Sequence, residues 1–177
     1  MLGLHKDIVR LVPYDPEWVE DYKKEEKILR ELIGDYVLDI QHVGSTSIPG
    51  LSAKPILDVA VAVKDENTLQ KLIPILTDAG YDVKDSISDL GEVLARKGLP
   101  ENRTHYIHIE VAGSEFWNNH ILFRDYLIKH SDYVREYERL KTEVFEQYKN
   151  ERKKYTLAKN EFISKVIEMA KLENLDK

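Results

Sequence analysis

Residues 36–63 read YVLDIQHVGSTSIPGLSAKPILDVAVAV, and this stretch decides the fold. Two runs rich in β-branched and aliphatic residues, 36–43 and 56–63, flank the polar turn GSTSIPG at 44–50. Such runs, bounded by glycine and proline, predict two strands joined by a turn. Large aliphatic side chains take alternate positions of the second run, so Asp58 should point to the opposite face of its strand.

Segments on either side of this stretch have helix or strand periodicity. Residues 16–34 and 67–79 repeat apolar side chains at helical spacing. The first begins beside Asp15, a typical helix cap, and the second stops at Gly80. We therefore expect two amphipathic helices. A short edge strand is also expected at 7–12, where β-branched residues precede a proline.

The second half of the sequence begins with strands and ends with helices. Weak strands are expected at 81–83 and 92–96, and the alternating run THYIHIEV at 104–111 predicts a strong strand. Its aliphatic side chains belong on the core face, so His108 and Glu110 on the other face should line a cleft. The remainder has only helical periodicity and predicts helices at about 115–130, 132–151 and 155–173.

These elements predict an α/β (α+β) fold in which helices pack on a mixed β-sheet. The sheet region covers about residues 1–113 and the helical region about 114–177, and no linker composition separates them. We therefore expect a single domain over residues 1–177 with a helical C-terminal third. A chain of this length can bury a sizeable core.

The composition excludes several classes of protein. The 177 residues contain no cysteine, which rules out disulfides, thiolate metal sites and thiol nucleophiles. No apolar run approaches the roughly 20 residues that a membrane helix needs, and the N-terminus lacks the apolar core of a signal peptide. The formal net charge of −6 argues against binding of extended nucleic acid. We expect a cytoplasmic protein without membrane contact, and no sequence feature fixes its oligomeric state.

The turn at 44–47 and the neighbouring carboxylate suit a phosphate group. Gly44 permits a tight turn and close approach of a phosphate to backbone N–H groups, and the hydroxyls of Ser45, Thr46 and Ser47 can donate hydrogen bonds to its oxygens. Asp58 lies in an otherwise apolar strand, where an unpaired carboxylate is costly, so it needs a cation, a metal or a ligand. We therefore expect the turn and Asp58 to share a cavity.

Five segments resemble the GrpB family and, through it, the nucleotidyltransferase superfamily. The superfamily motif is Gly-Ser, a spacer of about this length, and then two carboxylates separated by one residue. The segments similar to GrpB proteins are VPYDPEW (12–18), HVGSTSIPGLSAKPILDV (42–59), THYIHIE (104–110), FRDYL (123–127) and YTLAKNEFI (155–163). This resemblance implies a nucleotidyltransferase-like fold that binds a nucleotide and Mg²⁺.

Carried over residue by residue, Gly44 and Ser45 match the turn of the superfamily motif, Asp58 its first carboxylate and Glu110 its third. The resemblance thus implies that Asp58 and Glu110 are the catalytic residues and hold Mg²⁺, with Mn²⁺ or Zn²⁺ as alternatives. Position 60 departs from the motif, because Ala60 stands where the second carboxylate is found. Two cations about 4 Å apart need acids that offset their repulsion, so one metal is expected in place of two.

Further side chains complete the expected site. His108 shares a strand face with Glu110, and His42 lies on the strand that leads into the turn, so both are candidate metal ligands. Side chains interpreted as phosphate or ligand contacts are Lys54, Arg103, Arg124, Tyr155 and Lys159. His120 and His130 are interpreted as residues of a solvated helical face.

Three functions are compatible with these residues. The first is a nucleotidyltransferase-like protein that binds a nucleotide or phosphorylated small molecule with a divalent metal and transfers a nucleotidyl group. The second is a noncatalytic module for a ligand or partner, whose metal site has decayed at Ala60. The third is a metal-dependent hydrolase with a His/Asp/Glu centre made of His42, Asp58, His108 and Glu110.

Overall fold

The computed structural model describes residues 1–83 and 91–175. Within these ranges the strands form one five-stranded sheet in the order β1-β2-β5-β4-β3. β2 and β5 pair in parallel, and the other neighbours pair antiparallel. The strands are β1 (Val37–Val43), β2 (Leu57–Val63), β3 (Asp82–Val83), β4 (Glu92–Lys97) and β5 (His105–Val111). The α/β fold with a mixed sheet is therefore confirmed.

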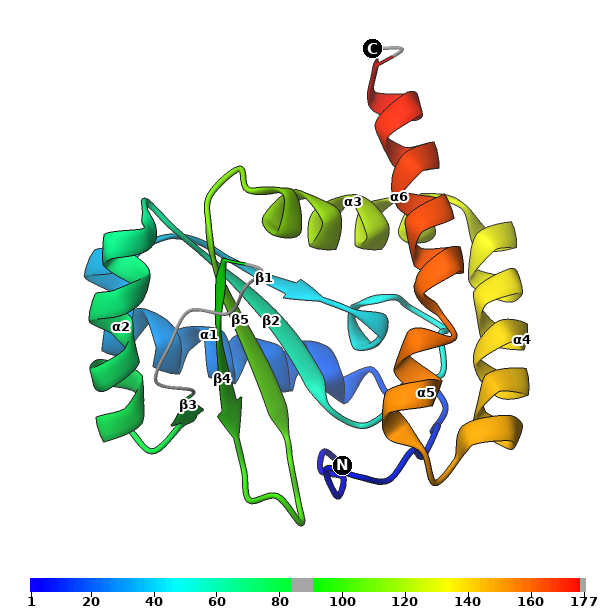
Figure 1. The fold of residues 1–177 in the computed structure, drawn as a ribbon, viewed down its shortest axis with the longest axis horizontal. Coiled ribbons are helices and arrows are strands. Elements are labelled where there is room, and N and C mark those ends of the chain that lie inside the picture. Colours follow the sequence, from blue (N-terminus) through cyan, green and yellow to red (C-terminus); the bar gives the residue numbers. More distant parts are fainter. Residues whose placement is uncertain (84–90, 176–177) are drawn as a thin grey trace.

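Helices cover both faces of the sheet and form the C-terminal part of the molecule (Figure 1). They are α1 (Glu17–Ile33), α2 (Glu66–Asp78), α3 (Glu115–Lys129), α4 (Ser131–Tyr148), α5 (Arg152–Leu157) and α6 (Asn160–Leu175), with the short 3-10 helices η1 (Gly34–Tyr36) and η2 (Ser45–Ser47). In Figure 1, α4, α5 and α6 stand together at one end of the molecule. Among the described residues, no helix is long and apolar enough to span a bilayer.

The alternation of β2 and β5 decides which helices cover which face. Val61 of β2 and Ile109 of β5 pack with Leu29 of α1 and Leu72 of α2 in the main core cluster. Because successive strand residues point to opposite faces, Asp58 faces α3 instead. Tyr106, His108 and Glu110 of β5 share that face. The packing of α1 and α2 thus leaves the polar face of β2 and β5 available for a site.

The edge strand expected at 7–12 is wrong. In the described chain this segment makes only an isolated bridge, between Val12 and Ala53. Its backbone groups have separated partners, since Val9 N donates to the carbonyl of Lys149 while Val12 N donates to the carbonyl of Ala53. The segment therefore connects the end of α4 with the loop before β2 and does not pair along one strand.

The helix expected at 155–173 is divided into α5 and α6. The break falls at Ala158 and Lys159, although neither glycine nor proline marks it in the sequence. It leaves Lys159 between the two helices, with its Nζ 4.4 Å from the centre of the Tyr155 ring. The break therefore places a lysine beside the polar face of the sheet.

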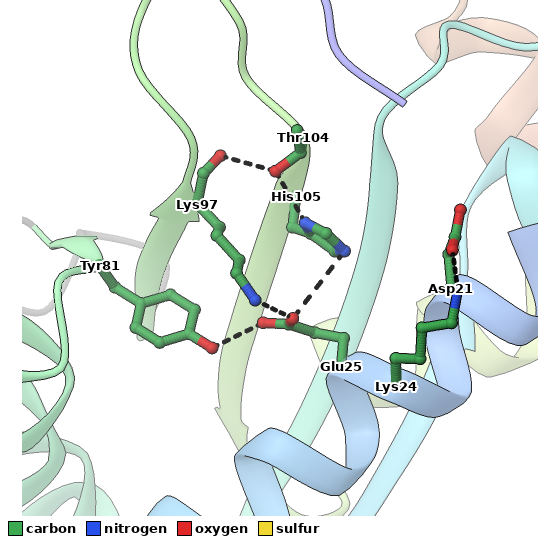
Figure 2. Close-up of polar contacts among 7 residues, drawn as sticks. All are labelled: Asp21, Lys24, Glu25, Tyr81, Lys97, Thr104 and His105. Atoms are coloured by element: carbon green, nitrogen blue, oxygen red, sulfur yellow. Dashed lines mark hydrogen bonds and ion pairs between the residues drawn. The ribbon is translucent and has the colours of Figure 1, made fainter. Parts of the chain in front are cut away.

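A buried polar network joins α1 to the sheet on the face away from α3 (Figure 2). Glu25 of α1 is 2% exposed, and its carboxylate accepts a hydrogen bond of 2.6 Å from the Tyr81 hydroxyl. Lys97 Nζ also donates to this carboxylate, and Nε2 of His105 lies 4.0 Å from it. Burial and the adjacent Glu25 charge raise the pKa of Tyr81 well above its usual value, so the phenol remains a donor.

Glu25→Ala is expected to lower the free energy of unfolding by about 1–3 kcal/mol, because the buried Tyr81 hydroxyl loses its acceptor. Lys97 is 36% exposed and can turn to water, which limits the cost. Urea denaturation measures the change, with Glu31→Ala on the exposed side of α1 as the matched control. Equal losses in the two variants would show that the network contributes nothing.

Candidate functional site

A cavity of about 420 Å³ lies between the polar sheet face, η2, α3 and the C-terminal helices. This volume is within the range of small-molecule sites, and apolar and aromatic side chains form much of the wall. The polar side chains in the wall are Ser45, Thr46, Lys54, Asp58, Tyr106, His108, Asn119, His120, Tyr137, Lys141, Tyr155, Thr156 and Lys159. The cavity therefore combines an apolar surface with a small set of convergent charged groups.

Gly44 allows the chain to leave β1 and turn beside Asp58. Its φ of 69° and ψ of −170° are a backbone conformation that only glycine adopts without strain. A Cβ at this position would lie 2.5 Å from Oδ2 of Asp58. The turn continues into η2, where the Ser47 hydroxyl donates to the Gly44 carbonyl at 2.6 Å. Glycine is thus required both by the turn and by the close approach of the carboxylate.

Asp58 is paired with an imidazole at the floor of the cavity. Its Oδ1 lies 3.6 Å from Nε2 of His108, and the other ring nitrogen of His108 lies 3.2 Å from the Glu92 carboxylate. Burial opposes the charge of Asp58, but the contact with His108 keeps its pKa below the usual value. Burial likewise opposes the charge of His108, but Asp58 and Glu92 raise its pKa to about 10. Asp58 is therefore an anion that already has a cationic partner.

A second imidazole and carboxylate adjoin His108. Nε2 of His120, on α3, lies 3.2 Å from Oε1 of Glu110, and the rings of His108 and His120 are 4.9 Å apart. Glu110 is 1% exposed, and neither of its oxygens has a hydrogen-bond donor among the described residues. One ligand atom from each of His108, Glu110 and His120 lies within 4.8 Å of the other two, as in a group that holds a metal ion.

Three lysines enter the cavity from the other side. Lys54 and Lys159 approach the Tyr155 ring, with Nζ 6.0 Å and 4.4 Å from its centre. Lys141 Nζ donates to the Ser52 carbonyl and lies 3.6 Å from Glu138. The lysines are therefore held among aromatic rings and carbonyls, with one carboxylate close to Lys141.

Burial shifts the pKa of each lysine downward. It lowers the pKa of Lys54 to about 7, and the charges of Arg152 and Lys159 lower it further. It lowers the pKa of Lys159 to about 8 against the attraction of Asp58. It lowers the pKa of Lys141 to about 8 against the attraction of Glu138. Part of the lysine charge is therefore lost near neutral pH when no anion is present.

The structure brings most of the expected site residues together. The cavity wall includes Gly44, Ser45, Thr46, Lys54, Asp58, His108, Tyr155 and Lys159. These residues come from the turn, from the connection before β2, from β2 and β5, and from α5 and the break that follows it. Residues distant in the sequence thus meet around one cavity.

Five other expected residues do not line the cavity. Glu110 stands four positions along β5 from Tyr106, the partner of Asp58, which separates the two acids by about 13 Å of strand. The Ser47 hydroxyl donates to the Gly44 carbonyl within the turn. Arg103 is 3% exposed and donates to Asp82 at 2.8 Å, at the β3 edge of the sheet. Arg124 donates to the Gln41 side chain at 2.8 Å and to the His42 carbonyl at 3.0 Å.

His42 lies away from the metal-type group. Its ring stacks on Tyr22 with 4.9 Å between the ring centres, and its Nε2 lies 2.9 Å from the Thr46 hydroxyl. Burial lowers its pKa to about 4, so the ring is neutral at neutral pH. His42 therefore stabilises the turn at 44–47 through its contact with the Thr46 hydroxyl.

Sequence reasoning missed several residues of the site. The interpretation of His120 as solvated is wrong, because it faces Glu110 and the cavity. Its spacing from Phe116 and Phe123, four and three residues, indicates the inward face of α3. Lys141 was also missed, although it follows Tyr137 by four residues and precedes Val144 by three, all three buried. The position of a charged residue on the apolar face of a predicted helix could have indicated that Lys141 is buried.

Comparison with known proteins identifies the family of this chain. The sequence model of the GrpB protein family matches residues 8–169. The chain belongs to the GrpB family. It is 37% identical to the glutamate-rich protein GrpB of Alkalihalophilus pseudofirmus, over 94% of this chain and 98% of that protein. It is 32% identical to the UPF0157 protein YqkA of Bacillus subtilis, over 92% of this chain but 47% of that protein.

The fold of a solved GrpB protein agrees with the one described above. The crystal structure of the conserved protein GrpB from Enterococcus faecalis superposes with a TM-score of 0.85 at 30% sequence identity. The match covers 95% of this chain and 100% of that chain. The sheet and the helical C-terminal part are thus features of a GrpB protein.

Proposed function

We propose that this GrpB protein binds a nucleotide or another phosphorylated small molecule in the cavity lined by Lys54, Lys141 and Lys159. The observation that carries the proposal is an excess of positive side chains around the cavity, where Lys141 and Lys159 are buried and Lys54 is half-buried. Among the described residues, neither Lys54 nor Lys159 has a carboxylate within 4.0 Å of its Nζ, whereas Asp58 is paired with His108. An anion would supply the missing partner.

The electrostatics favour a phosphate over a neutral ligand. Placing a lysine in an apolar cavity costs free energy unless the charge is paired or lost, and the lowered pKa values of the lysines reflect this cost. A phosphate dianion can pair with more than one ammonium group at once. The hydroxyls of Ser45 and Thr46 stand in the same wall and can donate to its remaining oxygens.

The apolar part of the wall suits the remainder of such a ligand. Phe116 and Phe123 of α3 and Ile163 of α6 contribute to it, so a nucleobase or another flat apolar group could pack there. This pairing of a lysine-rich side with an aromatic side supports a nucleotide over inorganic phosphate.

We further propose that, if the site is catalytic, the reaction is transfer of a nucleotidyl group from a nucleoside triphosphate. The hydroxyl oxygen of an acceptor bonds to the α-phosphorus, the bond between the α-phosphorus and the oxygen that bridges to the β-phosphate breaks, pyrophosphate leaves, and the hydroxyl proton passes to solvent. The three lysines would stabilise the charge on the transferring phosphate. The paired carboxylates that hold two Mg²⁺ ions in the superfamily motif do not fit here, since Ala60 lacks one and lies buried beside His108. We therefore assign no step to Mg²⁺.

Binding without chemistry is the alternative, and the buried Ala60 favours it. The two proposals differ in product. Protein incubated with ATP and Mn²⁺ or Zn²⁺ should release pyrophosphate if it transfers a nucleotidyl group, and Asp58→Asn should reduce that release. Binding of ATP with no pyrophosphate or transferred nucleotide would leave the binding module as the function.

Titration of ADP into the protein in the presence of EDTA tests the binding proposal. We expect Lys159→Met to weaken binding by about 10-fold or more, since a hydrogen bond to a charged group contributes about 1.5–3 kcal/mol. The matched control is Lys153→Met, an exposed lysine of α5 that should leave binding unchanged. Absence of binding by ADP, ATP and other phosphorylated metabolites, or equal effects of the two variants, would overturn the proposal.

A further inference from the structure

We propose that His108, Glu110 and His120 bind one divalent transition-metal ion at the β5 end of the cavity. The proposal does not rest on phosphate binding, because it follows from a separate group of side chains. Two strand residues that are two positions apart and one helix residue 10 and 12 positions further along the chain converge there, with ligand atoms within 4.8 Å of one another. This spacing needs only small side-chain movement to close around an ion.

Glu110 provides the second and independent observation. Its carboxylate is 1% exposed, and neither oxygen receives a hydrogen bond from a described residue, although Nε2 of His120 lies 3.2 Å from Oε1. The imidazole of His120 is the ion-pair partner of Oε1, but Oε2 has no donor among the described residues, and native structures seldom leave a buried carboxylate oxygen unsatisfied. A metal ion coordinated by this oxygen would satisfy it.

The neighbours of the group also suit a cation. Asp58 and Glu92 flank His108 at 3.6 Å and 3.2 Å, so three carboxylates surround the two imidazoles. Imidazoles that hold a metal through one nitrogen usually donate from the other to a carboxylate, which fixes the ring. An ion coordinated through one nitrogen of His108 would displace the proton that this nitrogen carries, and the acid beside the other nitrogen can take that role.

The small side chains of β2 leave room above the group. Ala60 and Ala62 are the strand partners of His108 and Glu110, respectively. A methyl group at each position lets the longer side chains of β5 rise toward α3, where His120 lies. The position that departs from the superfamily motif is therefore the one that accommodates the imidazole.

The donor types decide the class of metal. Two imidazoles and one carboxylate suit Zn²⁺, Fe²⁺ or Mn²⁺, whereas Mg²⁺ prefers an all-oxygen shell. Three protein ligands leave a position open, as in catalytic zinc sites. His108 and His120 both line the cavity, so an ion held by them would face a ligand inside it.

The test uses protein without a polyhistidine tag, stripped with EDTA and freed of chelator. Calorimetric titration with Zn²⁺ should give one ion per chain, and Co²⁺ substitution should give the visible absorption of a four-coordinate site. Titration with Mg²⁺ should give no heat from this site. The same experiment without any nucleotide separates this proposal from the phosphate site, whose test is performed in EDTA.

Three variants locate the ion. Because loss of even an outer-shell partner costs about 10–100-fold in metal affinity, removing a direct ligand in His120→Ala or Glu110→Gln should weaken Zn²⁺ binding by at least about 100-fold. His130→Ala is the matched control, since this histidine of the same region pairs with Glu173 at 2.8 Å and lies outside the group. His120 is 28% exposed, so His120→Ala should fold even if Glu110→Gln does not.

Stoichiometric Zn²⁺ that persists in His130→Ala and is lost in His120→Ala supports the site. The proposal is overturned if Zn²⁺, Mn²⁺, Fe²⁺ and Co²⁺ all fail to bind stoichiometrically, or if His120→Ala and His130→Ala lose the ion equally.

Discussion

Binding of ADP to the lysine-lined cavity should weaken by about 1,000-fold between about pH 6.5 and about pH 9. The reason is that the anion requires charged lysines, while burial lowers the pKa of Lys54 to about 7 and that of Lys159 to about 8 in the free protein. As the pH rises through these values the free protein loses the protons that the complex needs. Binding must therefore take up protons over this range, and the affinity must fall.

The ligand itself cannot produce this decrease. A phosphate monoester has its second pKa near 6, so its charge only becomes more negative as the pH rises, which by itself would strengthen binding to a cationic site. Calorimetric titration in two buffers of different ionisation enthalpy measures the proton uptake directly. An affinity that is constant or rises over this range would contradict lysine recognition of the phosphate.

Lys54→Met provides a second readout for the same charge. In the variant the pH dependence of ADP binding should become shallower. The ligand-free variant should also be more stable than the wild type near neutral pH. The folded-state pKa of Lys54 lies below the ordinary lysine value of 10.5, so the unfolded chain binds more protons and the wild type gains stability as the pH rises toward 10.5. The advantage of the variant should therefore shrink with rising pH.

The elements of the fold could be predicted from sequence where periodicity is strong. The strand that carries Asp58 and the strand that carries His108 alternate cleanly, so the face that each side chain takes follows from spacing alone. The segment at 7–12 has strand-like composition, but within residues 1–83 and 91–175 no second strand pairs along its length. The composition of a segment does not show whether a neighbouring strand is present to hydrogen-bond with it, and the strand was wrongly expected for this reason.

The site could be predicted only in part, because pairing partners are a tertiary property. The spacing of Gly44 from Asp58 suggested their meeting, and the close approach of the two positions agrees with it. No sequence pattern shows that Arg103 donates a hydrogen bond to Asp82. Nor does any pattern show that Arg124 donates to the Gln41 side chain and the His42 carbonyl. Basic residues in family-like segments therefore looked alike, although the lysines line the cavity and the two arginines do not.

Gly44→Ala should lower the free energy of unfolding by about 2–4 kcal/mol and displace Asp58 from the cavity floor. Two costs combine. The backbone at φ 69° and ψ −170° is strained for any residue with a Cβ, and the new methyl group would lie 2.5 Å from Oδ2 of Asp58. Chemical denaturation measures the stability, and ADP titration measures the damage to the site.

Gly50→Ala is the matched control for the backbone cost alone. Gly50 has a φ of 80°, but apart from its chain neighbours no described residue lies within 4 Å of the Cβ that alanine would add. It should therefore cost only about 1–2 kcal/mol and leave ADP binding intact. The difference between the two variants measures the close approach of Asp58 to the turn.

A double-mutant cycle assigns that difference to the carboxylate. In an Asp58→Ala background the Oδ2 contact is gone, so Gly44→Ala should cost less than it does in the wild type, by about 0.5 kcal/mol or more. If Gly44→Ala costs the same in both backgrounds, the turn and Asp58 are not coupled. The cost of Gly44→Ala would then come from the backbone alone, and the proposed cooperation of the turn at 44–47 with Asp58 in ligand binding would have no energetic support.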